Sequence, residues 1–231
     1  MNQSLNRIDG QLSLSERAYQ QIRDAIMQGR LESGRRLVYR TLAEELGISP
    51  TPVRDAIQRL VSDGALQLDD RGVAYVPVIT AETYIETINL RLTLESMAAA
   101  AVAAMPEGRE AIADQLAEIH ERVARAQREG RAVDALFGNE QFHFVYLRAA
   151  GMPILEGLVR SLWLRCGPSL RLVYNAGFKP LPIHPHVRLI DAIRKGDAAA
   201  ARQAVDEDLK YAGKHILRQL DPEAVSRVDW D

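Results

Sequence analysis

The sequence predicts a mainly α-helical protein, in which a winged helix-turn-helix with a small β-hairpin wing precedes an all-α six-helix bundle. Residues 39–77 support the first part, because two short amphipathic segments meet at a tight turn and an apolar hairpin with a charged turn follows. Beyond Pro77 only long helical periods appear, separated by Gly and Pro. The 231 residues suffice for two domains, which we expect at 1–78 and 79–231.

The first domain divides into three helices, a connector and a hairpin. We expect helices from Ser13 or Ser15 to about Gln28, from Thr41 to Leu46, and from Pro50 to about Ser62. Gly29 and Gly47 end the first two, and Ser49 is suited to cap the third. Residues 31–38 form a connector with a brief strand, and the β-prone runs 65–68 and 73–76 flank a turn. A helix that enters the major groove needs such a brace and wing, so this pattern indicates DNA binding.

The second domain shows no strand pattern. We expect its helices at roughly 80–104, 108–129, 131–150, 153–174, 183–195 and 197–220. Short links between the helices are typical of a bundle.

Charge is distributed unevenly along the chain, although the net charge is only −2. All four lysines lie in the C-terminal part, so the first 78 residues carry arginine as their only strong base. Five of these arginines cluster around the helix-turn-helix and wing: Arg35, Arg36, Arg40, Arg54 and Arg71. The planar fork of arginine suits phosphate and guanine, although solvated surface arginines are an alternative that only the surrounding motif disfavours.

Several classes of protein are disfavoured by what the sequence lacks. One cysteine and no signal-peptide pattern favour a cytoplasmic protein, and no apolar stretch reaches ~18 residues, so we expect no membrane span. No nucleophile turn, Gly-rich phosphate loop or HExxH motif is present, and Glu140–His143 is a lone Glu-x-x-His pair. We therefore predict no enzyme. The alternatives are a metal-dependent enzyme on a helical bundle and a constitutive DNA-binding protein without an effector.

Residues 40–60, RTLAEELGISPTPVRDAIQRL, resemble the DNA-binding signature of the GntR family of bacterial transcription regulators. The helical remainder resembles the FadR-type effector domain, called FCD, through Arg91-x-x-Leu94-Glu95, Phe142-His143 and the stretch 186–201. The resemblance implies a homodimer on a palindromic double-stranded operator. It also implies a helical domain that dimerises and senses a small molecule. Members of this family often sense small carboxylic acids and often act as repressors, so we expect both here. We expect the effector to shift the bundle helices and, through the linker at 75–80, the two DNA-binding heads.

The resemblance also assigns residues that contact DNA. They are Arg40, Ser49, Thr51, Pro52, Arg54, Arg71 and Gly72. Pro50 departs from the family pattern, which usually has arginine there, so one contact is missing. For Arg54 the alternative is an ion pair with Asp55 or Asp63.

Four positions of the helical domain correspond to a metal site that is common in this family. The family pattern is an aspartate four residues before a histidine, and two further histidines that lie twenty-two residues apart. Here the positions hold Asn139, His143, His186 and Asp208. The spacing of the pattern is therefore kept, and two of its four residue types are kept as well. Two imidazoles and a carboxylate suit zinc, nickel or manganese. The alternative is that the metal was lost and the pocket binds the effector directly.

The remaining candidates leave alternatives open. Arg91 either binds the carboxylate of an effector or forms an ion pair with Glu95. His184 is a substitute ligand or a rim residue, whereas His120 and His215 lie in charged surroundings and are expected to face solvent. Four aromatic residues line a pocket or belong to the plain core: Tyr146, Trp163, Tyr174 and Phe178.

Overall fold

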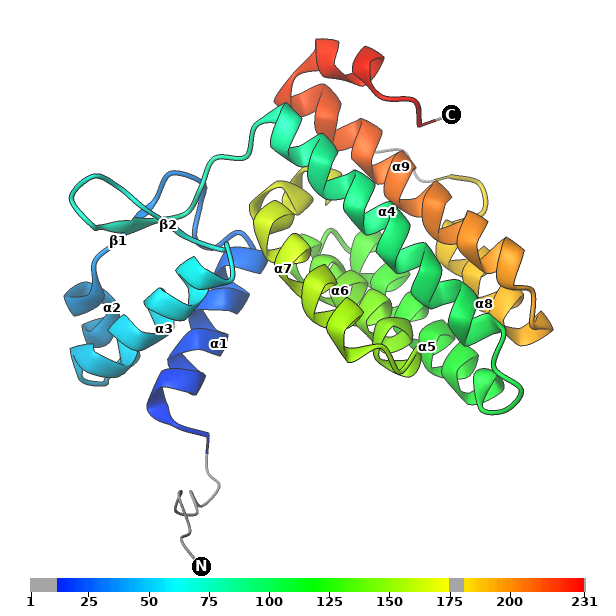
Figure 1. Cartoon of the computed structure of the whole chain (residues 1–231), viewed down its shortest axis with the longest axis horizontal. Coiled ribbons are helices and arrows are strands. Elements are labelled where there is room, and N and C mark those ends of the chain that lie inside the picture. The colour runs from blue at the N-terminus through cyan, green and yellow to red at the C-terminus, as the bar shows by residue number, and fades with distance from the viewer. Residues whose placement is uncertain (1–11, 175–180, 231) are drawn as a thin grey trace, which may run out of the picture.

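A computed structural model describes residues 12–174 and 181–230 of the chain. An N-terminal head lies beside a larger helical bundle (Figure 1). The head consists of α1 (Leu14–Met27), β1 (Arg36–Leu37), α2 (Tyr39–Leu46), α3 (Pro50–Ser62), β2 (Gln67–Leu68) and β3 (Ala74–Tyr75). The bundle consists of α4 (Ala81–Ala103), α5 (Arg109–Arg128), α6 (Ala132–Ala149), α7 (Pro153–Leu170), η1 (Arg171–Tyr174), α8 (Pro185–Lys195), α9 (Ala198–Leu220) and η2 (Pro222–Arg227). The predicted fold class is confirmed.

The head is held together by α1, which packs on α3 and buries Tyr19, Ile22 and Ile26. Gly47 closes α2 in the left-handed conformation with φ of 65°, which glycine adopts without steric penalty. The three strands form one antiparallel sheet in the order β1-β3-β2. The brief strand expected in the connector is therefore β1, and the predicted hairpin forms the wing.

The ends of several helices differ from the sequence-based expectation. α2 begins at Tyr39 rather than Thr41, without a side-chain cap. α7 ends at Leu170 rather than 174 and continues as a 3-10 turn. Pro168 lies inside this helix and cannot donate a backbone hydrogen bond, so it weakens the last turn. α8 begins at Pro185 rather than 183, because the His184 side chain caps it by accepting from the backbone N–H of His186.

The bundle is organised around α4 and α9, the two longest helices, which pack along each other. α4 also contacts α6, α7 and α8, and α5 packs on α6 and α8 (Figure 1). Ala98, Ala99 and Val102 of α4 are fully buried, and such small side chains allow close helix approach. No helix in the described part of the chain combines the length and apolarity needed to cross a membrane.

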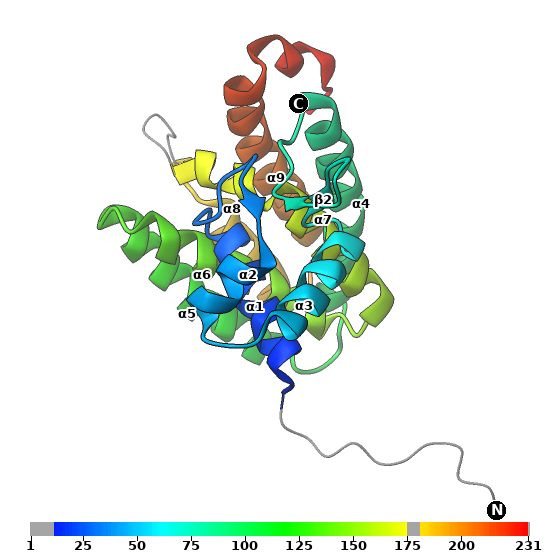
Figure 2. The same cartoon turned by 90° about the vertical axis from the view of Figure 1, so that its left-hand side faces the viewer.

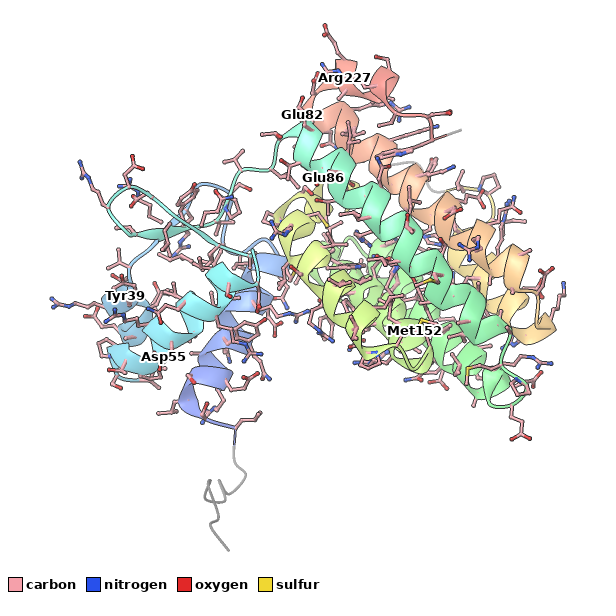
Figure 3. The ribbon with its side chains drawn as sticks, viewed as in Figure 1. Tyr39, Asp55, Glu82, Glu86, Met152 and Arg227 are labelled. Carbon is pink, nitrogen blue, oxygen red and sulfur yellow. The ribbon has the colours of Figure 1, made fainter. Side chains whose placement is uncertain are left out.

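The C-terminal segment folds back on the bundle, a feature the sequence analysis did not predict. Trp230 Nε1 donates to Asn89 Oδ1 at 2.9 Å, and the Trp230 ring lies so close to Gly213 that a Cβ there would be 2.8 Å away. Arg227 Nη1 lies 3.1 Å from Glu82 Oε1 at the start of α4, and Figure 3 shows both residues at this end of the bundle. The tail is thereby fixed against α4 and α9.

The head also contacts the bundle directly, with its three helices in front of the bundle in Figure 2. α1 packs on α7, where Met27 occupies the space beside Gly167. Ser161 Oγ of α7 donates to the backbone oxygen of Asp63 at 2.9 Å, directly after the last residue of α3. Arg23 of α1 forms an ion pair with Glu140 of α6. The linker is therefore not the only connection between the two parts.

Candidate functional site

The first candidate site is the outer surface of the helix-turn-helix. Thr51 and Arg54 are exposed at the start of α3, and Pro52 is half-buried. Arg40 and Ser49 line one shallow hollow beside the turn between α2 and α3. Figure 3 labels Tyr39 of α2 and Asp55 of α3 on this part of the head, away from the bundle. Five of the seven predicted DNA-contacting residues therefore lie together.

The positively charged side chains of this surface and of the wing are available to a ligand. Arg40, Arg54 and Arg71 are exposed, and none forms an ion pair within the described ranges 12–174 and 181–230. The alternative ion pair of Arg54 is not formed, and Asp63 instead accepts a hydrogen bond from Tyr19 Oη at 2.7 Å. Ser49 has the extended backbone of an N-cap residue, but its side chain accepts no bond from the helix, which differs from the predicted cap.

The tip of the wing is ordered by Asp69. Its Oδ1 accepts from the backbone N–H groups of Arg71 and Val73, both at 2.9 Å, and its other oxygen lies 2.8 Å from Arg36. Gly72 has φ of 74°, a conformation suited to glycine. This turn leaves the Arg71 side chain exposed at the tip.

The second candidate site is a cavity of about 50 Å³ inside the bundle. The predicted residues Arg91, Asn139, His143 and Asp208 line it, together with His184. They come from α4, α6, α9 and the residue that caps α8. The cavity has room for a few water molecules or a compact ligand, and it is well below the several hundred Å³ of a drug-sized pocket.

Three of the four predicted metal-site residues converge on one point. His143 Nε2 lies 3.3 Å from Asp208 Oδ2, and His186 Nε2 lies 3.9 Å from the same oxygen. One ligand atom from each residue lies within 4.8 Å of the others. His186 Nε2 is buried without a hydrogen-bond partner in the described structure. The fourth residue, Asn139, is on the cavity wall one helical turn before His143.

This donor set fits a divalent transition metal. Two imidazole nitrogens and one carboxylate oxygen are ordinary ligands for zinc and related ions. An unpartnered buried imidazole nitrogen that faces a carboxylate is the arrangement that a bound cation would satisfy.

Glu95, which the sequence analysis treated only as a partner of Arg91, is the centre of the polar network. Its Oε1 accepts from Arg91 Nε at 2.6 Å and from Trp163 Nε1 at 3.0 Å. Its Oε2 lies 2.7 Å from His143 Nδ1 and accepts from Tyr146 Oη at 3.0 Å. Trp163 and Tyr146 therefore belong to the site as well as the core, whereas the Tyr174 side chain and Phe178 lie outside the described residues.

The ionisation states follow from burial and from these contacts. Burial alone would raise the pKa of Glu95, but the charges of Arg91 and His143 outweigh it and lower that pKa to about 2. Burial likewise opposes the charged form of His143, but Glu95 and Asp208 raise its pKa above the ordinary value. Burial dominates at His186 and lowers its pKa well below the ordinary value. The two histidines therefore differ: their surroundings favour the charged form of His143 and disfavour that of His186.

Of the two alternatives for Arg91, an ion pair with Glu95 or a contact with an effector, the structure shows the first. The ion pair with Glu95 is formed, and both side chains are almost fully buried, with the guanidinium 4.2 Å from the centre of the Trp163 ring. Arg91 nevertheless lines the cavity. Its Nε donates to Glu95 and its Nη1 lies 3.6 Å from Cys166 Sγ, so the guanidinium is held in the cavity wall by two contacts.

The expectation that His120 faces solvent is wrong. Its ring is half-buried and its Nδ1 lies 3.3 Å from Nδ1 of His186. Burial lowers the pKa of His120 to about 4. His215 is also half-buried, and its Nε2 lies 3.1 Å from the backbone oxygen of Leu172. The sequence signal for His120 was weak, because only the packing of α5 on α8 brings it to His186.

A winged helix-turn-helix beside a helical domain with a polar internal cavity defines a class, the DNA-binding transcription regulators that respond to a small molecule. The chain belongs to the gntR family of bacterial regulatory proteins, which it matches over residues 14–76, and residues 86–211 match the FCD domain.

Relatives agree with this assignment. The HTH-type transcriptional regulator McbR of Escherichia coli is 30% identical over 200 residues, which are 85% of this chain and 89% of that protein. The solved structure of E. coli McbR/YncC has a TM-score of 0.73 at 27% identity and covers 94% of this chain and 99% of that chain. The gluconate operon transcriptional repressor of Bacillus subtilis is 25% identical over 206 residues, which are 85% of this chain and 82% of that protein.

These matches establish a bacterial transcription regulator with a DNA-binding head and an FCD effector-binding domain. The family and the relatives are regulators and not enzymes, as predicted.

Proposed function

We propose that this protein is a homodimeric repressor whose FCD domain holds a divalent metal and binds a compact carboxylate, which changes the affinity for a palindromic operator. The observation that carries the proposal is the unpartnered His186 Nε2, which faces Asp208 and His143 beside the cavity. Repression is supported by the relative from Bacillus subtilis, which is named a transcriptional repressor.

On the DNA side, α3 enters the major groove and the wing touches the backbone. Arg54 and Thr51 contact base edges or phosphates at the start of α3, and Arg40 reaches the groove from α2. Ser49 and Pro52 complete this surface, while Arg71 and Gly72 contact the backbone from the wing. The exposure of the three arginines and their lack of ion pairs in the described chain support this assignment.

In the bundle, His143, His186 and Asp208 would hold the metal, and the side-chain carbonyl of Asn139, on the cavity wall, would be the fourth protein donor. The bound ion would supply positive charge to a carboxylate oxygen of the effector. Arg91, which Glu95 holds beside the cavity, would bind the other end of the effector. The small volume of the cavity favours a short acid over a large ligand.

The response passes from the cavity to α3 through α7 as well as through the linker. Trp163 of α7 is hydrogen-bonded to Glu95, and Ser161, two residues earlier, is bonded to the backbone of Asp63 after α3. A ligand that moves Glu95 therefore acts on the helix that also contacts the DNA-binding head. A coupling of ~1–3 kcal/mol would suffice for regulation.

The metal assignment is tested by measuring the metal content of the purified protein and of a His143→Ala, His186→Ala double variant after equilibration with zinc, nickel or manganese. We expect about one ion per chain in the native protein and none in the double variant. A His215→Ala variant, which alters a histidine outside the cavity, serves as the control. Equal metal in the native protein and the double variant would refute the assignment.

The regulatory assignment is tested on a mapped operator by gel-shift titration with small mono- and dicarboxylates, with and without metal. We expect at least one short acid to change operator affinity only when metal is present. Full operator affinity in every ligand state would instead support a constitutive DNA-binding protein.

A further inference from the structure

His120 lies outside the four positions of the proposed metal site but contacts one of them. It is on α5, and its Nδ1 lies 3.3 Å from Nδ1 of His186, whereas the other nitrogen of His186 faces Asp208. The two nitrogens of the His186 ring therefore have different neighbours. Which nitrogen carries the single proton of the neutral ring decides whether His186 can bind a metal through Nε2.

We propose that His120 is a positioning residue that accepts a hydrogen bond from Nδ1–H of His186 and so keeps the lone pair of His186 Nε2 directed at Asp208. This inference rests on the proposed metal site and adds a residue that supports one of its ligands.

The surroundings of Nε2 favour this tautomer. A proton on Nε2 would have no acceptor, because the nearest carboxylate oxygen, Asp208 Oδ2, is 3.9 Å away and beyond hydrogen-bond distance. A proton on Nδ1 has an acceptor in His120 Nδ1 at 3.3 Å. A buried N–H without an acceptor is unfavourable, so the proton belongs on Nδ1.

Rotation of the ring is also restricted. The His186 ring is stacked on Phe142 with a centroid distance of 3.6 Å and an interplanar angle of 5°. Its backbone N–H donates to His184 Nδ1 at 3.2 Å, which fixes the start of α8. His184 has its Nδ1 engaged in this cap, so the tautomer of His186 depends on His120.

His143, the other imidazole, also has a different neighbour at each ring nitrogen. His143 directs Nε2 to Asp208, while its Nδ1 side is held by Glu95 Oε2 at 2.7 Å. Both ligand histidines thus present Nε2 to one carboxylate, and each has a second group at Nδ1. Loss of such a supporting partner typically weakens metal binding about 10- to 100-fold.

The first test compares the zinc affinity of four proteins by competition with a chromophoric chelator. His120→Ala removes the acceptor, and we expect about 10- to 100-fold weaker zinc binding. His120→Asn can place a carbonyl oxygen where Nδ1 was, and it should restore most of the affinity. His215→Ala is the matched control, since it alters a half-buried histidine that contacts Leu172 and Gln219 instead. Unchanged affinity in His120→Ala, or equal loss in the Asn variant, would overturn the proposal.

The second test reads the tautomer directly in metal-free protein from the nitrogen shifts of labelled histidine. Native His186 should show Nδ1–H alone, and His120→Ala should show a mixture. An Nε2–H tautomer in the native protein would overturn the proposal. This measurement separates the two claims: a native protein that binds no zinc refutes the metal site, whereas the tautomer still decides the role of His120.

Discussion

Glu95 retains a negative charge at a position with 0% exposure, because four side chains satisfy its two oxygens. Arg91 and His143 supply positive charge, and Trp163 and Tyr146 supply hydrogen bonds. A buried ion pair is stabilising only when the remaining polar atoms are paired, which is the case here. The stability of this centre therefore depends on a single carboxylate.

Replacement of Glu95 by Gln should destabilise the fold by about 3–5 kcal/mol, because Arg91 and His143 lose their shared counter-charge. The pKa of Glu95 is lowered to about 2 from an ordinary 4.5, so its stabilisation is present above pH 4.5 and lost as pH falls toward 2. The difference between the variant and the native protein should narrow over that range. Urea unfolding at several pH values measures it.

Glu86→Gln is the control for this prediction, since Glu86 is on the same helix but exposed (Figure 3). Equal stability of the Glu95→Gln variant and the native protein at neutral pH would contradict the proposed role of the carboxylate.

Arg54→Ala should lower specific operator binding by ~1–3 kcal/mol if Arg54 contacts a base edge. Arg218→Ala, which removes an exposed arginine from α9, should leave affinity unchanged. The affinities of both variants for the operator and for a random duplex are measured at one salt concentration and compared with those of the native protein. An equal loss on both duplexes would assign Arg54 to phosphate contact without base recognition.

The candidate residues of the site were assigned by the resemblance to the FCD domain, and spacing along one helix adds only which of them share a helix face. Asn139 with His143, and Arg91 with Glu95, are each four residues apart, so they share a helix face. For Trp163 and Tyr146 the sequence left a pocket wall and the plain core as alternatives, and His120 was expected to face solvent. Their roles depend on how separate helices pack, which helical periodicity does not determine.

At the level of elements, α7 makes contacts with both the polar network and the head that its sequence alone does not indicate. One of its faces supplies Trp163 to Glu95, and another supplies Ser161 to the backbone of Asp63. The sequence predicts this helix and its first residue, and it places the expected route of the signal in the linker at 75–80; the contacts of α7 add a second route to that proposal. The contact with the head depends on tertiary packing of α1 and α7.

Ser161→Ala should reduce the change in operator affinity on effector binding, while effector and metal affinity stay the same. The reason is that the bond from α7 to the end of α3 is lost but the cavity is intact. Paired gel-shift and calorimetric titrations measure both quantities. Ser226→Ala removes a comparable serine-to-carbonyl bond in η2 and is the control. Undiminished coupling in Ser161→Ala would leave the linker as the route.

At the scale of the whole molecule, the exposed apolar side chains of the two contacting helices α4 and α7 form a candidate interaction face. Leu90 and Met97 are seven residues apart on α4, and Ile154 and Leu158 are four apart on α7, with exposures of 46%, 41%, 82% and 54%. The two helices contact each other. We expect this face to form the homodimer interface, because clustered exposed apolar residues mark interaction surfaces. The dimer would place two heads about one DNA turn, ~34 Å, apart.

Leu158→Glu should convert the dimer to a monomer and weaken operator binding, since a charge at an apolar interface is unfavourable. Light scattering coupled to size exclusion measures the mass. Ile183→Glu, at an equally exposed apolar residue before α8, is the control. A dimeric Leu158→Glu protein would place the interface elsewhere.

The order of the two parts and the fold of each were predictable, because helical and hairpin patterns are local. The contact between head and bundle was not, and neither was the return of the C-terminal segment over α4. Trp230 and Gly213 illustrate the reason. They are seventeen residues apart in the sequence, and their close packing depends on how the C-terminal segment folds back on α9.

The placement of the two tryptophans allows intrinsic fluorescence to report ligand binding in the cavity. Trp163 lies against Arg91 and Glu95 beside the cavity, and Trp230 lies at the far end of the chain. Replacing Trp230 with Phe would leave one indole, whose fluorescence reports only on the cavity. Candidate acids and metals can then be screened by emission alone, before any operator sequence is known.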